Sequence, residues 1–123
     1  MKVDFDNNIP IYIQIADAIE DDILSGKLEP GGNCYSQVVL AKELKVNPAT
    51  AAKGIKLLVE RDILEKVRGQ AMIIKNDAIA TIKARRIDET LKQLISQVVT
   101  EAMTLGVEEK TLIEKIKEEY HGK

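Results

Sequence analysis

The segment Leu44–Thr50 constrains the fold of this 123-residue chain more than any other. Asn47 is a favourable helix N-cap, because its side chain can accept a hydrogen bond from a backbone N–H that has no partner within the helix. Pro48 follows at the first helical position, where its missing N–H costs nothing and its fixed φ angle suits a helix. The sequence therefore predicts a helix that ends near Leu44, a three-residue turn, and a second helix that begins at Pro48.

The outward side of this second helix begins with Ala49, Thr50 and Lys53. In an arbitrary protein such residues are ordinary helix-start residues that face solvent. Here they follow a tight turn between two helices, and in a helix-turn-helix the second helix presents its first exposed side chains to base edges in the major groove of DNA. We therefore interpret these residues, together with Asn47, as those through which the second helix would enter the major groove.

Four lysines surround the turn, namely Lys42, Lys45, Lys53 and Lys56, and only Glu43 opposes them. They could form a merely solvated face. A local excess of positive charge in a chain of net charge −2 instead favours phosphate contacts for at least two of them.

The flanking segments predict a mainly α winged helix-turn-helix domain over residues 1–76. A run of isoleucines after Pro10 recurs every four residues and predicts an amphipathic helix that ends at Ser25-Gly26. Two short β-like runs, residues 63–67 and 71–75, surround a glycine-containing loop and predict a hairpin, the wing. The residues expected to face the core from the second and third helices are Val39, Leu40, Leu44, Ile55, Leu58 and Val59.

Residues 77–123 predict a C-terminal helical hairpin. No Gly or Pro occurs between Asp77 and Thr104, and Gly106 separates this long helix from a shorter one. Two helices have too little mass to bury their own apolar stripe, so we expect them to pair with the same element of a second copy in a homodimer. The residues expected at that contact are Ile82, Ile87, Leu91, Leu94, Ile95, Val98 and Ala102.

Composition narrows the function classes. The single cysteine, Cys34, cannot form an internal disulfide, and no signal-peptide or membrane-spanning pattern occurs, so we expect a cytoplasmic protein without a membrane partner. Buried apolar filler is the expected role of Cys34. The chain carries no nucleophile elbow, P-loop, dinucleotide glycine pattern or metal-ligand cluster. We expect no enzyme activity and no cofactor, and no residues specify a small-molecule effector.

The chain resembles the GntR family of bacterial transcriptional regulators over about its first 75 residues. The matching segments are Ile9-Pro10-Ile11-Tyr12-Ile13-Gln14-Ile15, Ile23-Leu24-Ser25-Gly26-Lys27-Leu28-Glu29-Pro30-Gly31, Leu40-Ala41, and Val46-Asn47-Pro48-Ala49-Thr50. The two-helix tail is similar to that of the YtrA-type subfamily, in which the small C-terminal part serves dimerisation. The resemblance implies a homodimer that binds a pseudo-palindromic operator and commonly represses a nearby operon, often a transporter operon.

Three positions depart from the family pattern. The family usually has Leu-Pro-Ser-x-Arg before the second helix, whereas this chain reads Cys34-Tyr35-Ser36-Gln37-Val38. Val38 can neither hydrogen-bond a guanine nor neutralise a phosphate. Ile55 replaces a usual aromatic residue, and the wing reads Gly69-Gln70-Ala71 instead of Gly-x-Gly.

These departures leave two hypotheses. The favoured one is a regulator that binds double-stranded DNA; the alternative is a winged-helix protein-interaction module that has lost DNA binding. The residues expected to contact DNA are Ser36, Gln37, Lys45, Asn47, Ala49, Thr50, Lys53, Lys56, Arg68, Gly69 and Gln70.

Overall fold

The computed structural model describes residues 1–69 and 71–123, so Gln70 lies outside the described residues. The chain divides into two compact units, Met1–Ala84 and Arg85–Lys123. Within the described residues, no helix is both long enough and apolar enough to span a bilayer.

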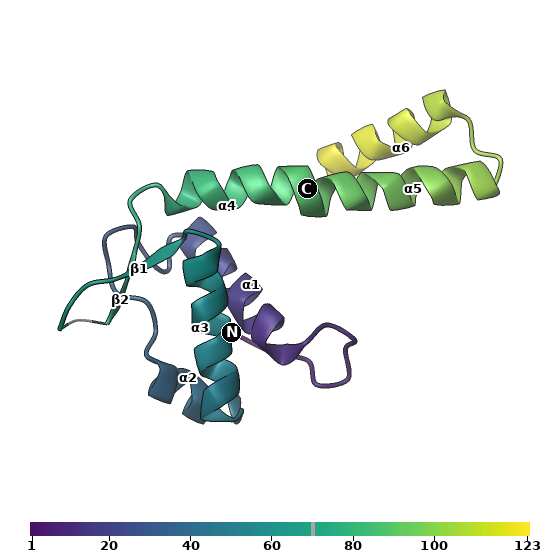
Figure 1. The fold of residues 1–123 in the computed structure, drawn as a ribbon. Coiled ribbons are helices and arrows are strands. Elements are labelled where there is room, and N and C mark those ends of the chain that lie inside the picture. Colours follow the sequence, from purple (N-terminus) through teal and green to yellow (C-terminus); the bar gives the residue numbers. More distant parts are fainter. Residues whose placement is uncertain (70) are drawn as a thin grey trace. The chain divides into compact units, whose positions relative to one another are not determined.

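The first unit begins with three helices, α1 (Ile11–Leu24), α2 (Gln37–Leu44) and α3 (Pro48–Glu60) (Figure 1). α1 follows Pro10 directly, and its buried face carries the isoleucines that recur every four residues. α2 and α3 are joined by the three residues that the sequence predicts as a turn. The helix-turn-helix is therefore confirmed.

A two-stranded antiparallel hairpin follows α3. β1 (Leu64–Lys66) pairs with β2 (Met72–Ile74), with Leu64 opposite Ile74 and Lys66 opposite Met72. This is the predicted wing, shortened by a residue at each end of both strands. The wing completes the winged helix-turn-helix.

The chain before α2 pairs with the other edge of β2, which the sequence did not predict. The Gly31 N–H donates to the Ile74 carbonyl at 2.7 Å, and the Cys34 N–H donates to the Met72 carbonyl at 2.8 Å. Turn residues dominate this segment, so its composition predicts a loop and not a segment that pairs with β2. The pairing arises only when the tertiary fold brings the segment beside that strand. The wing is thereby tied to the start of the helix-turn-helix.

The core of the first unit is aliphatic and includes residues beyond the predicted domain boundary. It is formed by Ile15, Ala16, Ile19, Ile23, Cys34, Leu40, Ala41, Ala51, Ile55, Leu58, Ile63, Leu64, Ile74, Ala78 and Ile82. The last two belong to α4 (Ala78–Arg86), so the first unit extends past residue 76. Ile82 is fully buried in this core, which removes it from the residues available to a second copy.

Two valines differ from their expected positions. Val39 and Val59 were expected to face the core, but they are 46% and 38% exposed. The buried stripe of α3 instead runs through Ala51, Gly54, Ile55 and Leu58, which lie on one helix face at three- and four-residue steps.

In the second unit, the helix predicted over residues 77–104 continues through a π-helical segment. This segment, η1 (Ile87–Leu91), follows α4 and leads into α5 (Lys92–Thr104). π-Helical segments are rare inside helices, and the apolar periodicity does not predict this one. Arg85 and Glu89 form an ion pair of 3.7 Å along this stretch.

Gly106 ends α5 in a left-handed conformation with φ of 70°. The Val107 N–H donates to the Ala102 carbonyl at 2.8 Å, and the Gly106 N–H donates to the Met103 carbonyl at 3.2 Å. These two hydrogen bonds form a Schellman motif, which satisfies carbonyls left open at a helix end. The chain then turns into α6 (Glu109–Gly122).

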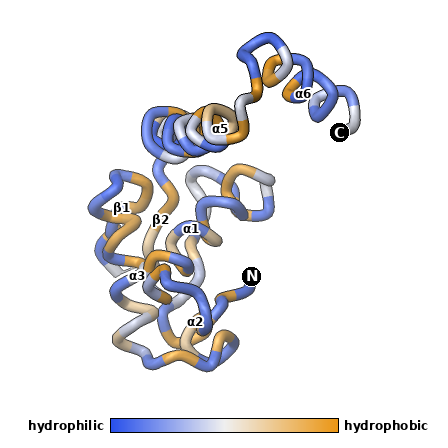
Figure 2. The backbone as a smooth tube through the Cα atoms, turned by 90° about the vertical axis from the view of Figure 1, so that its right-hand side faces the viewer, coloured by the Kyte–Doolittle hydropathy of each residue, from blue (hydrophilic) through white to orange (hydrophobic). Residues whose placement is uncertain are grey.

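The helices α5 and α6 leave much apolar surface exposed, and Figure 2 shows apolar stretches alternating with polar ones along both. Ala102 is only 7% exposed, so it is covered within the unit itself. The large exposed apolar residues of this unit are Ile87, Leu91, Leu94, Ile95, Val98, Val99, Met103, Leu105, Ile113, Ile116 and Tyr120.

Candidate nucleic-acid interface

Two side-chain caps fix where α2 and α3 begin. The Ser36 hydroxyl accepts a hydrogen bond from the Val39 N–H at 3.1 Å. The Asn47 side chain accepts one from the Ala49 N–H at 2.8 Å. Each cap satisfies a backbone donor that the helix leaves open, so both residues have a structural role in addition to any contact with DNA.

The turn between the two helices is short because Lys45 adopts a left-handed conformation, with φ of 55°. Few residues other than glycine do so. The Gln37 side chain crosses the turn and donates from Nε2 to the Pro48 carbonyl at 3.2 Å. The first turn of α2 is therefore held beside the first turn of α3, which places Gln37 and Pro48 at one corner.

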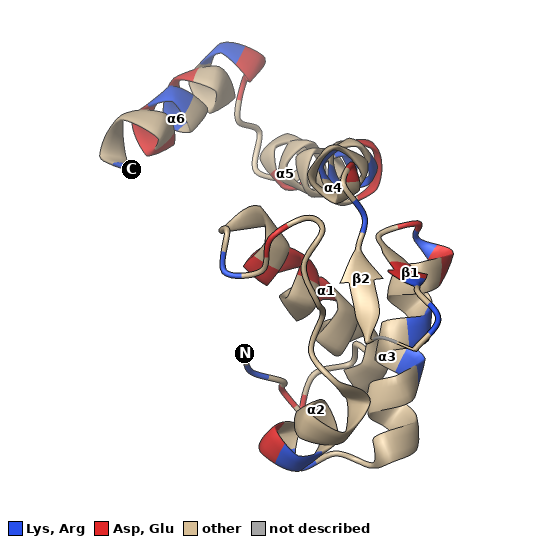
Figure 3. Ribbon diagram, turned by 90° about the vertical axis from the view of Figure 1, so that its left-hand side faces the viewer, with Lys and Arg blue, Asp and Glu red and all other residues tan. Residues whose placement is uncertain are grey.

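The outward face of α3 is small and basic. Ala49, Lys53 and Lys56 are exposed, and Thr50 is half-buried. Basic residues occur on α2, on α3 and in the hairpin (Figure 3). An exposed face of this composition matches what DNA requires, namely small groups near base edges and cations near phosphates.

Val38 is 74% exposed in the first turn of α2. The structure thus leaves an apolar side chain in solvent next to Gln37 and Ser36, both of which were expected to contact DNA. No contact among the described residues explains why a valine stands at this exposed position.

The wing carries the remaining predicted contacts. Arg68 and Gly69 are exposed, and Gly69 has φ of 77°, a conformation that a side chain would strain. Gln70, also expected to contact DNA, lies outside the described residues. Lys66, exposed at the end of β1, adds a cation to the surface of the wing that the sequence pattern does not predict.

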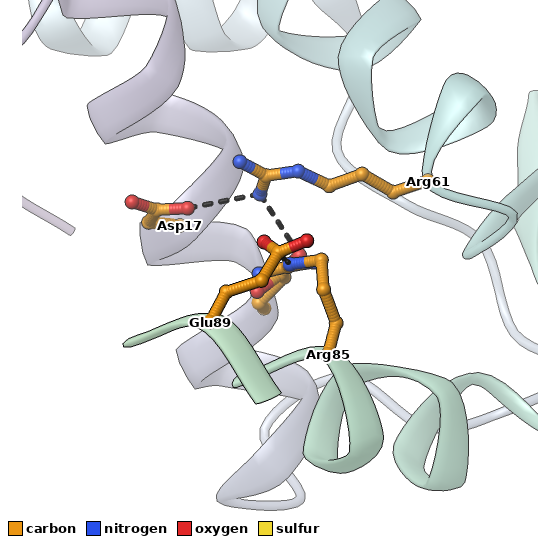
Figure 4. Close-up of polar contacts among 5 residues, drawn as sticks. Asp17, Arg61, Arg85 and Glu89 are labelled. Carbon is orange, nitrogen blue, oxygen red and sulfur yellow. Dashed lines mark hydrogen bonds and ion pairs between the residues drawn. The ribbon is translucent and has the colours of Figure 1, made fainter. Parts of the chain in front are cut away.

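An ion-pair cluster on the side of α1 fixes the end of α3 and the entry to the wing. Arg61 Nη1 lies 2.9 Å from Asp17 Oδ1 and 2.9 Å from Glu20 Oε2 (Figure 4). Glu20 is fully buried, and Asp62, which follows, has φ of 66°. The residues are 41 and 44 positions apart, so sequence spacing gives no signal for this cluster.

Lys53 has an aromatic partner that its position in the sequence does not predict. Its Nζ lies 4.1 Å from the centroid of the Tyr12 ring on α1. A cation over an aromatic face is attracted by the negative face of the ring. One lysine of the predicted DNA surface is therefore held in place from α1.

Cys34 and Tyr35, just before α2, lie in surroundings that raise the pKa of each side chain. Burial raises the pKa of the Cys34 thiol to about 11, against the opposing effect of a backbone hydrogen bond from Tyr35. Partial burial, followed by the hydrogen bond to Asp22, raises the pKa of Tyr35 to about 12. The Tyr35 hydroxyl donates to Asp22 Oδ2 at 2.6 Å.

Among the described residues, no group of His, Cys, Asp and Glu side chains could hold a metal ion.

The chain is similar in sequence and in fold to individual transcriptional regulators. No family model matches the chain. The chain is 36% identical over 121 residues to the HTH-type transcriptional repressor YtrA of Bacillus subtilis (strain 168), a match that covers 96% of this chain and 90% of the repressor.

Two solved structures extend this likeness. A GntR family transcriptional regulator from Listeria monocytogenes has a TM-score of 0.75 and 31% identity, covering 93% of this chain and 98% of that chain. S. agalactiae BusR in complex with its busAB-promotor DNA has a TM-score of 0.53 and 26% identity, covering 89% of this chain and 56% of that chain. This chain belongs to the GntR family of transcriptional regulators and is a DNA-binding regulator of the YtrA type.

Proposed function

We propose that the protein is a homodimeric repressor that binds a pseudo-palindromic operator in double-stranded DNA. The observation that carries this proposal is the exposed, basic start of α3, fixed by the Asn47 cap and by the Gln37 hydrogen bond. A helix held in this way can enter a major groove without first becoming ordered. The likeness to a repressor over nearly the whole chain supports the direction of regulation.

Within the interface, we assign different roles to different residues. Asn47, Ala49 and Thr50 approach base edges, because they stand at the start of α3. Cationic residues contact phosphates and fix the orientation of the protein without reading sequence. The residues assigned to phosphates are Lys45, Lys53, Lys56 and Arg68; Ser36, Gln37, Gly69 and Gln70 complete the expected DNA surface.

The homodimer is proposed from the apolar surface of the second unit. A groove of about 420 Å³ between α5 and α6 is lined by aliphatic side chains and by Tyr120. The same surface on a second copy would bury these side chains in a two-fold contact. Of the residues expected there, Ile87, Leu91, Leu94, Ile95 and Val98 are exposed. Two half-sites would then lie about one helical turn apart, or a small multiple of it, at roughly 34 Å per turn.

The site of action follows from the same proposal. The operator lies in the promoter region of an operon, and the resemblance to the YtrA type favours a transporter operon. A repressor of this kind works in the bacterial cytoplasm, where promoter DNA is found. Neither catalysis nor a cofactor is needed for it.

Two substitutions about one turn apart on α3 test the proposal. We expect Thr50→Ala to weaken specific binding more than non-specific binding, because a base contact is lost. We expect Lys53→Ala to weaken binding to every sequence and to reduce the salt slope by about one. Binding is measured by fluorescence anisotropy on selected and mixed-sequence duplexes over a salt series.

The same measurement tests the alternative, an interaction module that has lost DNA binding. Phosphate contacts release counterions, so a DNA-binding protein gives a steep dependence of affinity on salt. Absent binding or a flat salt dependence, for a wild-type protein shown to be folded, would favour the interaction module. An equal loss on all sequences for Thr50→Ala would remove Thr50 from the base-reading residues.

A further inference from the structure

A groove of about 730 Å³ opens beside the start of α3, on the side that faces α1 and the N-terminal loop. Its lining includes Phe5 from the loop, Tyr12 from α1, Lys45 and Asn47 from the turn, and Thr50 and Lys53 from α3. The groove therefore adjoins the predicted base-reading residues, and two of its walls come from elements that the proposed function does not use.

The charge of the groove is positive. Among the described residues that line it, the charged ones are Lys45 and Lys53. The acidic residues of the N-terminal loop do not line it, and Asp4 uses its Oδ1 to accept a hydrogen bond from the Asp6 N–H at 3.0 Å. A groove with two cations beside a major-groove helix suits an anion on the backbone of the same duplex.

The Lys53 ammonium is held at the groove by Tyr12. Its Nζ lies 4.1 Å from the ring centroid. A lysine side chain is flexible and loses rotamer freedom when it binds a phosphate. An aromatic face attracts the ammonium without neutralising it, so N–H donors on the side away from the ring stay available to an anion.

The N-terminal wall is also fixed. Gln14 on α1 accepts a hydrogen bond at Oε1 from the Asp4 N–H at 2.7 Å. Its Nε2 donates to the Asp4 carbonyl at 2.9 Å and to the Ile9 carbonyl at 2.8 Å. One side chain therefore joins both ends of the loop to α1 and holds Phe5, which is 63% exposed, at the rim of the groove.

We propose that this groove binds a phosphodiester of the DNA backbone and that Tyr12 is the positioning residue for Lys53. The N-terminal loop and α1 thus form a third DNA-contacting element, in addition to α3 and the wing. The inference rests on the proposed function, because it assumes that α3 approaches a duplex.

A double-mutant cycle on mixed-sequence duplex DNA tests the proposal, with affinity measured by fluorescence anisotropy over a potassium chloride series. We expect Tyr12→Leu to weaken binding by about two- to fivefold, the size of an exposed cation–π contact. Tyr12→Phe keeps the ring and should bind like wild type. In the Lys53→Ala background, Tyr12→Leu should have no further effect, because the lysine that it positions is gone.

Lys27→Ala is the matched control, since Lys27 is an exposed lysine beyond the other end of α1. We expect it to leave affinity and salt slope unchanged. Thermal unfolding of each variant checks folding, and Tyr12→Met replaces Tyr12→Leu if the latter does not fold.

Other outcomes also contradict it. If Tyr12→Leu weakens binding by the same factor in both backgrounds, Tyr12 does not act through Lys53. If Tyr12→Leu has no effect in folded protein, the ring does not position the lysine for DNA. Salt-dependent binding by wild type with no coupling overturns this inference alone, whereas an absence of wild-type binding overturns the proposed function as well.

Discussion

Val38 occupies the first turn of α2, where the family usually has an arginine, and its side chain is 74% exposed. A cation at this position would directly follow Gln37, whose side chain reaches the start of α3. We expect Val38→Arg to strengthen binding to mixed-sequence DNA and to make its salt slope steeper by about one, as one added phosphate contact requires. Fluorescence anisotropy over a salt series measures both.

Val59→Arg is the matched control, because Val59 is another partly exposed valine, near the opposite end of α3. It changes the net charge by the same amount. Equal gains for both variants would show that total charge, and not the position of Val38, determines the effect.

The burial of Cys34 predicts that its thiol reacts slowly. With its pKa raised to about 11 by burial, the thiol stays protonated near pH 8, and the thiolate is the reactive form. We expect slow reaction with a disulfide reagent in the native protein and fast reaction after unfolding. Native protein that reacts as fast as unfolded protein would show that Cys34 is accessible.

The same shift predicts a dependence of stability on pH. The folded-state pKa of Cys34 lies above the thiol's ordinary value of 9.0, so its contribution to stability is fully present below pH 9.0. It is lost as the pH rises from there to about 11, because unfolding then releases a proton that the native state retains. Chemical denaturation of wild type and Cys34→Ala across this range should show the smaller decline in the variant.

At the scale of elements, the close approach of α1 and α3 depends on Gly54. A Cβ at this position would lie 2.9 Å from Ile15 Cγ2 and 3.1 Å from the Tyr12 carbonyl oxygen. Alanine has the higher helix propensity by about 1 kcal/mol, but overpacking a well-packed site costs about 1–3 kcal/mol. We expect Gly54→Ala to lower the free energy of unfolding by about 1 kcal/mol, measured by chemical denaturation; an increase would show that α1 and α3 can separate without cost.

The Arg61 cluster joins α1 to the end of α3 and the entry to the wing. Removing one member of a buried ion pair is costly, because a buried charge then loses part of the interaction that compensated its desolvation. We expect Arg61→Ala to lower the free energy of unfolding by about 3 kcal/mol. Glu60→Ala, at the exposed neighbouring position, should change it little. If both variants change the free energy of unfolding by similar amounts, the ion pairs of Arg61 do not stabilise the fold.

Local signals predict most elements but not the contacts between them. The Asn47-Pro48 pair, the isoleucine spacing of α1 and the glycine loop of the wing each determine structure within a few residues, so the sequence predicts them. The π-helical segment η1 has no such signal. The Arg61 cluster and the Tyr12–Lys53 contact join distant residues, and chain folding alone brings them together. Ile82 is likewise buried in the core of the first unit. Its periodicity predicts that it is covered, but not whether by this core or by a second copy.

At the scale of the whole molecule, the apolar groove of α5 and α6 carries the proposed dimer. We expect Val98→Glu to raise the dimer dissociation constant by about 100-fold or more, because a two-fold contact sets like charges against each other in an apolar surface. Sedimentation measures the oligomeric state. Ser96→Glu, at an exposed position of α5 outside the groove, should remain dimeric. A dimer that tolerates Val98→Glu would place the subunit contact elsewhere.

We propose that a second copy and a two-fold operator complete this regulator. Selection of genomic DNA fragments from the source organism with the purified full chain, at near-physiological salt, tests it most directly. We expect enrichment of one or a few promoter sites whose half-sites are related by two-fold symmetry and separated by about one helical turn or a small multiple of it. If protein shown to be folded and dimeric enriches no site, the chain is not an operator-binding regulator, and a module that binds other proteins is favoured.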